Sequence, residues 1–231
     1  MSDALKEAAA RAALDEVGIG ATIGIGTGST AEAFIRLLAE RVRDGLDVEG
    51  VCTSERSERL CGELGVRTTT LDRVPRLSVA VDGADEIGPE LALIKGGGGA
   101  LLREKIVAAA ADRFVVIADE TKLVERLGRF PLPVEVEPFG IEPTRLAVGR
   151  IARAHGAHGE LVLRLDGAEP FVTDGGHHIL DVAFGVVADP DALARDLVAV
   201  PGVVEHGLFL QMASVAYVAG AAGVRKLERP A

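Results

Sequence analysis

The sequence predicts an α/β protein: a parallel sheet flanked by helices, with a smaller α+β domain inserted towards the C-terminus. Over the first 130 residues, short apolar runs alternate with amphipathic helical patterns, which is typical of a parallel sheet with helices on both faces. After the proline-rich connector FPLPVEVEPFG (130–140), the order becomes helix, strands, helix, strand. We therefore expect a Rossmann-like domain from residues 1–132 plus 206–231, and a ferredoxin-like domain at 133–205.

The elements of the first domain follow in order. Ser2 or Asp3 can cap a first helix that runs to about Val17, before Gly18 and Gly20. Strands are expected at 21–26, 47–54, 76–85 (including a loop) and 113–119, with helices after them at 31–43, 55–65, 103–111 and 120–128. The polar stretches TGST, TSERS, DGAD and ADETK each stand where a predicted strand ends. Ligands of such sheets bind beyond the carboxyl ends of the strands, so these four stretches mark the expected site.

The second domain reads as helix 143–156, strands at 159–166, 170–174 and 177–182 with DGG as a hairpin turn, helix 189–200 and a strand at 201–210. The tail from residue 208 is expected to rejoin the first domain.

Composition narrows the classes of function. The net charge of −10 argues against general nucleic-acid binding, which needs a basic surface, but allows a small phosphorylated ligand. No apolar run reaches the ~18–20 residues of a membrane span, and the charged N-terminal stretch MSDALKEAAARAAL does not read as a signal peptide. The only cysteines, Cys52 and Cys61, form no CxxC motif. A soluble, cytoplasmic protein is expected.

GIGTGSTAEAF (24–34) is a glycine-rich turn between a strand and a helix, a place where backbone N–H groups and the helix dipole favour phosphate. A dinucleotide-binding turn would need a third glycine where Ser29 stands. A phosphate-binding NTPase loop would need a lysine after the glycines. A sugar-phosphate site fits better, although a tight turn with helix-capping hydroxyls is a real alternative.

DGADE (82–86) and KGGGGALLREK (95–105) hold the remaining charged groups. Asp82 and Asp85 can cap the next segment, bind Mg²⁺ or accept hydrogen bonds from sugar hydroxyls. Lys95 before the glycines can stabilise a developing oxyanion, and Glu104 can act as a general base. By itself, Glu104 also reads as an ordinary first-turn acid favoured by the helix dipole.

Several motifs together resemble one family. GIGTGSTA, VDGADEI, KGGGGALLREKIVA, IADETK and FPLPVEV, followed by FVTDGGHHILDV and VPGVVEHGLF, are similar to ribose-5-phosphate isomerase of the A type over nearly the whole chain. The resemblance implies interconversion of ribose 5-phosphate and ribulose 5-phosphate in the non-oxidative pentose phosphate pathway. It implies an enediolate, no metal and no other cofactor, and a homodimer or homotetramer.

The resemblance also implies roles for particular residues. Glu104 matches the catalytic base, while Asp82, Asp85 and Lys95 match the polar catalytic and sugar-binding set; either aspartate can serve ring opening. The implied substrate-binding residues are Thr27, Gly28, Ser29, Thr30, Asp82, Gly83, Ala84, Asp85, Lys95, Gly96, Gly97 and Gly98, with Lys122 and Lys6 towards the phosphate.

Two other functions compete with the isomerase. A sugar-phosphate-sensing domain would have a similar fold, but it would normally carry a helix-turn-helix, and residues 1–20 offer one helix. A nicotinamide-dependent oxidoreductase is disfavoured by Ser29. Conversion of ribose 5-phosphate without added metal or cofactor would separate the three.

Overall fold

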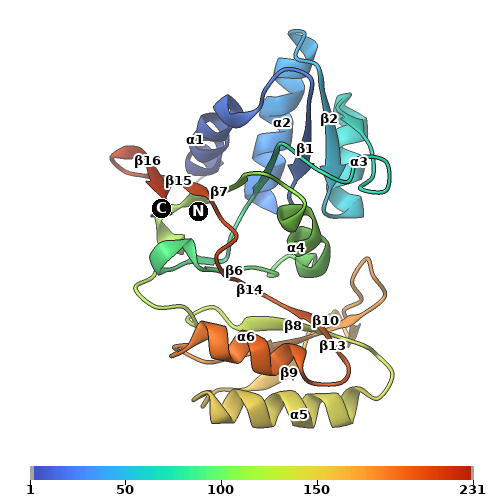
Figure 1. Ribbon diagram of the computed structural model, residues 1–231, viewed down its shortest axis with the longest axis vertical. Coiled ribbons are helices and arrows are strands. Elements are labelled where there is room, and N and C mark those ends of the chain that lie inside the picture. Colours follow the sequence, from blue (N-terminus) through green and yellow to red (C-terminus); the bar gives the residue numbers. More distant parts are fainter. Residues whose placement is uncertain (1–2, 230–231) are drawn as a thin grey trace. The chain divides into compact units, whose positions relative to one another are not determined.

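The computed structural model describes residues 3–229, which divide into two compact units. The first unit takes in residues up to 84, 103–123 and 211 onward, and the second takes in 85–102 and 124–210. Ser2, one of the two expected caps of the first helix, lies outside the described residues. Figure 1 shows the elements of each unit.

The first unit contains a seven-stranded sheet. Its order is β16-β15-β7-β4-β1-β2-β3, parallel throughout except for the antiparallel pair β15 and β16. The strands are β1 (Ala21–Ile25), β2 (Val48–Cys52), β3 (Arg67–Thr68), β4 (Val79–Asp82), β7 (Phe114–Asp119), β15 (Val215–Gly220) and β16 (Gly223–Glu228). The six parallel strands run in the 3-2-1-4-5-6 order of a doubly wound sheet. The expected α/β class with a central parallel sheet is confirmed.

Helices cover this sheet because side chains alternate between its two faces. Ile23 and Ile25 belong to the same buried cluster as Phe34 of α2 (Ser29–Arg43) and Ala9 of α1 (Asp3–Ala13). Gly24 faces the other way, and a Cβ there would lie 2.5 Å from Val107 of α4 (Leu101–Ala109). The 3₁₀ turn η1 (Leu14–Glu16) follows α1, and α3 (Glu55–Leu64) follows β2.

The second unit contains a four-stranded antiparallel sheet of order β13-β8-β12-β9. Its chain order is β8 (Leu132–Val136), α5 (Ile141–Ala154), β9 (Leu161–Leu163), β12 (His178–Val182), α6 (Pro190–Val198) and β13 (Val203–His206). This is the β-α-β-β-α-β sequence of a ferredoxin-like unit. A short pair, β10 (Leu165–Asp166) and β11 (Glu169–Pro170), lies between β9 and β12.

The unit boundaries differ from the expected domain boundaries at 85–102, 124–132 and 206–210, which all lie with the second unit. The physical reason is pairing that the sequence pattern did not reveal. β5 (Glu86–Ile87), β6 (Leu93–Ile94) and β14 (Leu208–Phe209) form a three-stranded sheet. The buried Glu86 carboxylate also accepts the N–H groups of Gly128 (2.8 Å) and Phe130 (2.6 Å). These bonds tie the connector to the second unit.

Two expected elements are wrong. The predicted helix at 120–128 is only the 3₁₀ turn η3 (Glu120–Lys122), because Val124 N–H donates to Ile87 O instead of continuing a helix. The predicted strand at 170–174 is mostly loop; only Pro170 is in a strand. Thr173 there accepts the N–H groups of Gly175 and His177, which folds the segment into a turn.

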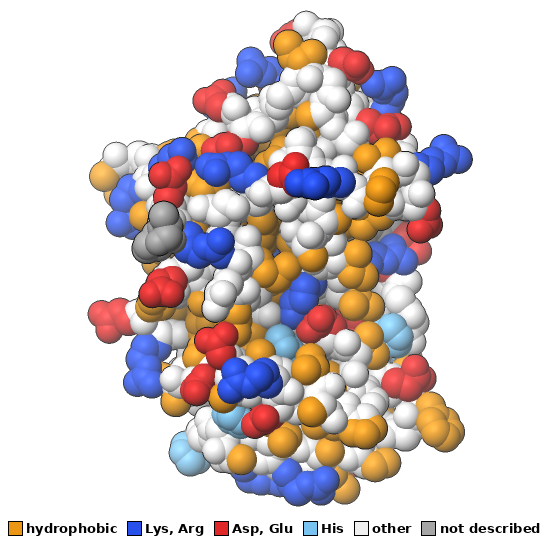
Figure 2. All heavy atoms as spheres, viewed as in Figure 1, with side chains coloured by type: hydrophobic (Ala, Val, Ile, Leu, Met, Phe, Trp, Pro, Cys, Tyr) orange, Lys and Arg blue, Asp and Glu red, His pale blue; other side chains and the backbone are white. Residues whose placement is uncertain are grey.

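The surface mixes charges of both signs. On the face drawn in Figure 2, acidic and basic side chains are interspersed with apolar ones and form no single large basic area. Between residues 3 and 229, no helix is both long enough and apolar enough to cross a membrane.

Candidate active site

The loop between β1 and α2 lies where the strand order of the first unit reverses. β1 pairs with β2 on one side and β4 on the other, so chain connections leave this point in opposite directions, which is where open α/β sheets bind their ligands. Thr27 and Gly28 form the turn, with Gly28 at φ 101°. Ser29 and Thr30 begin α2, so their hydroxyls stand beside the N–H groups of a helix N-terminus. This is the chemistry of a phosphate site.

A cluster of hydroxyl groups backs this loop. Thr27 Oγ1 lies 2.7 Å from Thr53 Oγ1 and 2.8 Å from Ser54 Oγ. Ser57 Oγ donates to Gly26 O at 2.7 Å. Ser54 also caps α3 by accepting the Ser57 N–H. The sequence marked TSERS as a polar strand end but gave these residues no role, and the structure assigns them to holding the loop.

Asp82 ends β4 beside the same loop. Its Oδ1 accepts the N–H groups of Thr27 (3.1 Å) and Gly83 (2.7 Å), and the residue is only 3% exposed. A Cβ on Gly26 would collide with this carboxylate, so glycine is required at that position. The predicted residues Thr27 and Asp82 therefore meet within the first unit.

Glu104 lies in the first turn of α4 and is 4% exposed. Burial of this depth is unusual for glutamate, which is almost never buried without a specific partner or role. The exposed first-turn acid of α3, Glu55, shows what an ordinary position of this kind looks like. The contrast separates Glu104 from a simple helix-dipole acid.

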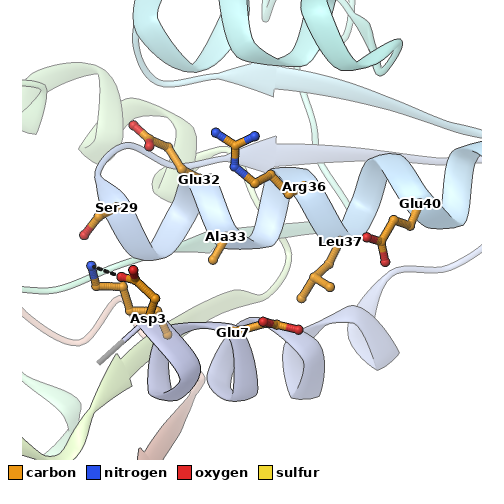
Figure 3. A pocket seen from close by; sticks show the side chains of 9 residues that line it. Asp3, Glu7, Ser29, Glu32, Ala33, Arg36, Leu37 and Glu40 are labelled. Atoms are coloured by element: carbon orange, nitrogen blue, oxygen red, sulfur yellow. Dashed lines mark hydrogen bonds and ion pairs between the residues drawn. The ribbon is translucent and has the colours of Figure 1, made fainter. Parts of the chain in front are cut away.

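Two lysines of the first unit were predicted to act near the phosphate. Lys122 ends η3, directly after β7. Lys6 of α1 lines a groove of about 450 Å³ together with Ser29 of α2, and in Figure 3 the side chains of Ser29 and Asp3 lie at the same end of that groove. Lys6 Nζ is 3.3 Å from Asp3 Oδ1. Asp3, Glu7, Glu32 and Glu40 line the groove against the two cations Lys6 and Arg36, so the charge of its lining is acidic.

The second unit holds Lys95, Asp85 and the glycine loop (residues 96–99). Lys95 follows β6 and is 2% exposed; its N–H donates to Gly207 O at 2.9 Å, and its ammonium lies 5.4 Å from the centre of the Phe209 ring. That distance is within the range of a cation–π interaction. Because the Lys95 backbone is hydrogen-bonded and its side chain is buried, its ammonium group is held in one place, as the stabilisation of an oxyanion requires.

Asp85 contacts the glycine loop directly. Its Oδ2 accepts the Gly97 N–H at 2.7 Å, and its own N–H donates to Ile94 O. Gly96 and Gly99 have φ of 104° and 79°, angles that side-chain-bearing residues rarely adopt. Glycine at these positions thus permits a backbone path that brings the Gly97 amide to the Asp85 carboxylate.

Comparison with known proteins identifies the family of this chain. The family model of ribose 5-phosphate isomerase A (phosphoriboisomerase A) matches residues 49–223. The ribose-5-phosphate isomerase A of Agrobacterium fabrum is 58% identical over 224 residues, covering 97% of each chain. The isomerase structure from Methanocaldococcus jannaschii superposes with a TM-score of 0.91 at 39% identity, covering 99% of this chain and 100% of the other. A D-ribose-5-phosphate isomerase in complex with phospho-erythronic acid gives a TM-score of 0.92 at 37% identity, with 99% and 100% covered. The chain belongs to the ribose 5-phosphate isomerase A family.

Proposed function

We propose that this protein interconverts D-ribose 5-phosphate and D-ribulose 5-phosphate through an enediolate, with Glu104 as the base. The observation that carries this assignment is the buried carboxylate of Glu104 in the first turn of α4, the helix that begins directly after the glycine loop. A base that removes a proton from carbon must be held on a rigid element, and a helix start provides this.

The reaction moves a carbonyl between C1 and C2. Starting from ribose 5-phosphate, Glu104 takes the proton from C2 while the C1 carbonyl oxygen gains negative charge. The proton of the C2 hydroxyl moves to that oxygen, and Glu104 returns its proton to C1 as the C2 oxygen becomes the carbonyl. Lys95 and the amides of the glycine loop stabilise that charge. Asp82 or Asp85 carries the proton needed to open the ribofuranose ring. No step in this scheme needs a metal.

Chain connectivity supports joint action of these groups. Asp82 and Asp85 are three residues apart, so their Cα atoms are at most about 11 Å apart. The glycine loop ends two residues before α4 begins at Leu101, and Glu104 lies in the first turn of that helix. We therefore propose that Asp82, Asp85, Lys95 and Glu104 act on one substrate.

We assign the binding of the substrate phosphate to the loop before α2. Gly28, Ser29 and Thr30 supply hydroxyl and amide donors, and Lys122 and Lys6 supply charge. Thr27 contributes by holding the loop, since its N–H donates to Asp82 and its hydroxyl to Ser54. A relative binds phospho-erythronic acid, a four-carbon acid whose carboxylate and phosphate resemble the charges of an enediolate phosphate. Gly83, Ala84, Gly96, Gly97 and Gly98 complete the proposed substrate-binding set. A cytoplasmic location and a homodimer or homotetramer remain part of the proposal, on the strength of the family.

The test is Glu104→Gln, which keeps the shape of the side chain but cannot take a proton. Positioned general bases contribute roughly 10²–10⁴-fold in rate, so kcat for ribose 5-phosphate should fall at least about 100-fold. Affinity should stay within about tenfold of wild type, because ground-state contacts are kept. Exchange of the C2 proton with solvent should cease, as followed by NMR.

Glu55→Gln is the matched control, since Glu55 is the first-turn acid of α3; its kcat should stay at the wild-type value. If Glu104→Gln keeps most of its activity, the base is another residue, and Asp82 or Asp85 is next. If the wild type does not convert ribose 5-phosphate in the absence of an added cofactor, the assignment as an isomerase is wrong. A sugar-phosphate sensor or a nicotinamide-dependent oxidoreductase then becomes the better assignment.

A further inference from the structure

The peptide unit between Gly96 and Gly97 is held at both ends. Its N–H, on Gly97, donates to Asp85 Oδ2 at 2.7 Å. Its carbonyl, on Gly96, accepts a hydrogen bond from Arg164 Nη1 at 2.8 Å. A trans peptide is planar and directs its C=O and N–H to opposite sides, so one plane links the guanidinium of Arg164 to the carboxylate of Asp85.

Arg164 is itself fixed. It lies between β9 and β10, and its Nε and Nη2 donate side-on to the two carboxylate oxygens of Asp181, at 2.8 and 2.5 Å. Both side chains are largely buried, with 15% and 18% exposed. A bidentate pair of this kind sets orientation as well as distance. The remaining Nη1 is left directed at the loop.

Two more contacts extend from Arg164 to the loop. Nη1 also lies 3.3 Å from Gly97 O, which forces the Gly98 N–H to point away from the guanidinium. The guanidinium stands 6.0 Å from the centre of the Phe171 ring, and that ring occupies the space where a side chain on Gly99 would lie. Arg164 therefore fixes two successive peptide planes and supports the ring that closes the loop.

We infer that Arg164, held by Asp181, is a positioning residue for the isomerisation: it acts through the Gly96–Gly97 peptide to hold Asp85, and turns the Gly98 N–H towards the substrate oxyanion. Two successive amides on one side of a glycine turn form a concavity that binds anions. A cation on the carbonyl side polarises the peptide and strengthens the hydrogen bond on its N–H side. The inference rests on the proposed function for its effect on turnover, but the clamp is a property of the free protein.

Arg164→Met removes the charge and every donor while retaining an unbranched apolar chain. Misplacing catalytic groups by about 1 Å costs on the order of 100-fold, so kcat should fall about 10- to 100-fold, with KM changed less than about threefold. Arg164→Lys should recover part of the loss, because an ammonium can reach the Gly96 carbonyl but cannot also hold Asp181 side-on.

Arg145→Met is the matched control. Arg145 also donates twice to a carboxylate of the second unit, Glu142, but makes no bond to the glycine loop. Its kcat and KM should equal those of wild type. If Arg164→Met stays within twofold of this control in kcat, the inference is wrong.

A double mutant separates positioning from a general loss of stability. If Arg164 acts through Asp85, then Arg164→Met added to Asp85→Asn should lower kcat by less than about threefold beyond Asp85→Asn alone. Independent sites would give multiplied losses, and a multiplied loss here would overturn the inference.

Hydrogen exchange of the Gly97 amide, measured by NMR on the full chain without substrate, tests the clamp apart from the function. Exchange should be about tenfold faster in Arg164→Met than in Arg145→Met. Unchanged exchange overturns the clamp whatever the kinetics show. An inactive wild type with faster Gly97 exchange in the variant would overturn the proposed function and leave the clamp standing.

Discussion

The two loops that carry the proposed chemistry use the same arrangement with different partners. In the first unit, the Gly26–Thr27 peptide gives its N–H to Asp82 and its carbonyl accepts from the Ser57 hydroxyl. In the second unit, the Gly96–Gly97 peptide gives its N–H to Asp85 and its carbonyl accepts from Arg164. Each aspartate of DGAD is thus held by one clamped peptide, and the clamp is a neutral hydroxyl in one case and a charged guanidinium in the other.

The difference follows from the stiffness of each chain segment. In the first loop, the Thr27 side chain is itself held by the hydroxyls of Thr53 and Ser54, so the loop is fixed by more than its clamped peptide. The glycine loop has four successive glycines, the residues that lose most conformational entropy on ordering. Hydrogen bonds to charged groups contribute about 1.5–3 kcal/mol, against about 0.5–1.5 kcal/mol for neutral ones. The glycine loop, the more flexible of the two, is therefore held by the stronger hydrogen-bond donor, the guanidinium of Arg164.

The largest expected effect comes from adding a methyl group to each loop. A Cβ on Gly26 would collide with the buried carboxylate of Asp82, and one on Gly97 would lie 2.6 Å from Asp85 Oδ1. Asp82 has no room to move, whereas Asp85 is half-buried. Gly26→Ala should therefore lower kcat about 100-fold and Gly97→Ala about tenfold, measured at saturating ribose 5-phosphate.

Gly62→Ala and Gly149→Ala are the controls for these two substitutions. Both positions lie within helices, α3 and α5, and a Cβ there meets nothing closer than 3.6 Å. Each should keep wild-type kcat. A greater loss in Gly97→Ala than in Gly26→Ala would show that burial of the carboxylate does not set the order.

The second prediction uses the hydroxyls that only the first loop carries. Ser29→Ala combined with Thr30→Ala removes two donors from the proposed phosphate site and leaves the reacting carbons untouched. KM should rise about tenfold while kcat stays within about threefold, the pattern of lost ground-state binding. Steady-state kinetics check this, with Ser78→Ala, an exposed serine bonded to Thr22 O, as the control. An unchanged KM would show that this loop does not bind the phosphate of the substrate.

The smallest effect on rate is expected away from both loops, at Tyr217. Its hydroxyl donates to Glu16 Oε1 at 2.7 Å, and Arg113 donates to Glu16 Oε2 at 2.9 Å. Burial and the Glu16 hydrogen bond raise the pKa of Tyr217 to about 12. Burial alone would raise the pKa of Glu16, but the bonds from Tyr217 and Arg113 outweigh it, so that pKa is lowered.

Tyr217→Phe should lower the free energy of unfolding at pH 7 by about 1.5–3 kcal/mol and leave kcat unchanged. The contribution of Glu16 is present above the unfolded pKa of about 4.3 and is lost as pH falls below it; that of Tyr217 is present below about pH 10 and is lost as pH rises towards 12. The difference between wild type and variant should therefore shrink at both ends of the pH range. Urea unfolding at pH 3, 7 and 11 measures this, and a difference independent of pH would contradict it.

The sequence predicted the elements whose signal is local. Apolar runs between turn residues located β1, β2, β4 and β7, and the polar residues after them located the first loop and Asp82. It did not predict β5 and β6, because two-residue strands have no periodicity. It also did not predict that the end of the strand expected at 201–210 pairs separately, as β14, with β6 across more than 100 residues. The helix expected at 120–128 failed for the same reason: a tertiary hydrogen bond to Ile87 O outweighs local propensity.

The residues of the candidate site also divide into those with a local signal in the sequence and those without one. Asp82, Asp85, Lys95 and Glu104 belong to the glycine-containing motifs DGADE and KGGGGALLREK, so a reader of the sequence can find them. Arg164 lies in LVLRLD, where nothing distinguishes it from other strand-edge arginines. Its bonds to Gly96 and Gly97 span 68 and 67 residues, and only the fold reveals them.

The first unit's sheet depends on strands from two distant parts of the chain. β15 (Val215–Gly220) pairs with β7 (Phe114–Asp119), and almost the whole second unit lies between them in sequence. During synthesis on the ribosome, β7 therefore emerges long before its partner. Every residue of β7 is buried in the finished fold, so its open edge is an apolar template for pairing with other chains. The second unit, complete by residue 210, can fold first, and the nascent first unit is the part of this chain that we expect molecular chaperones to bind.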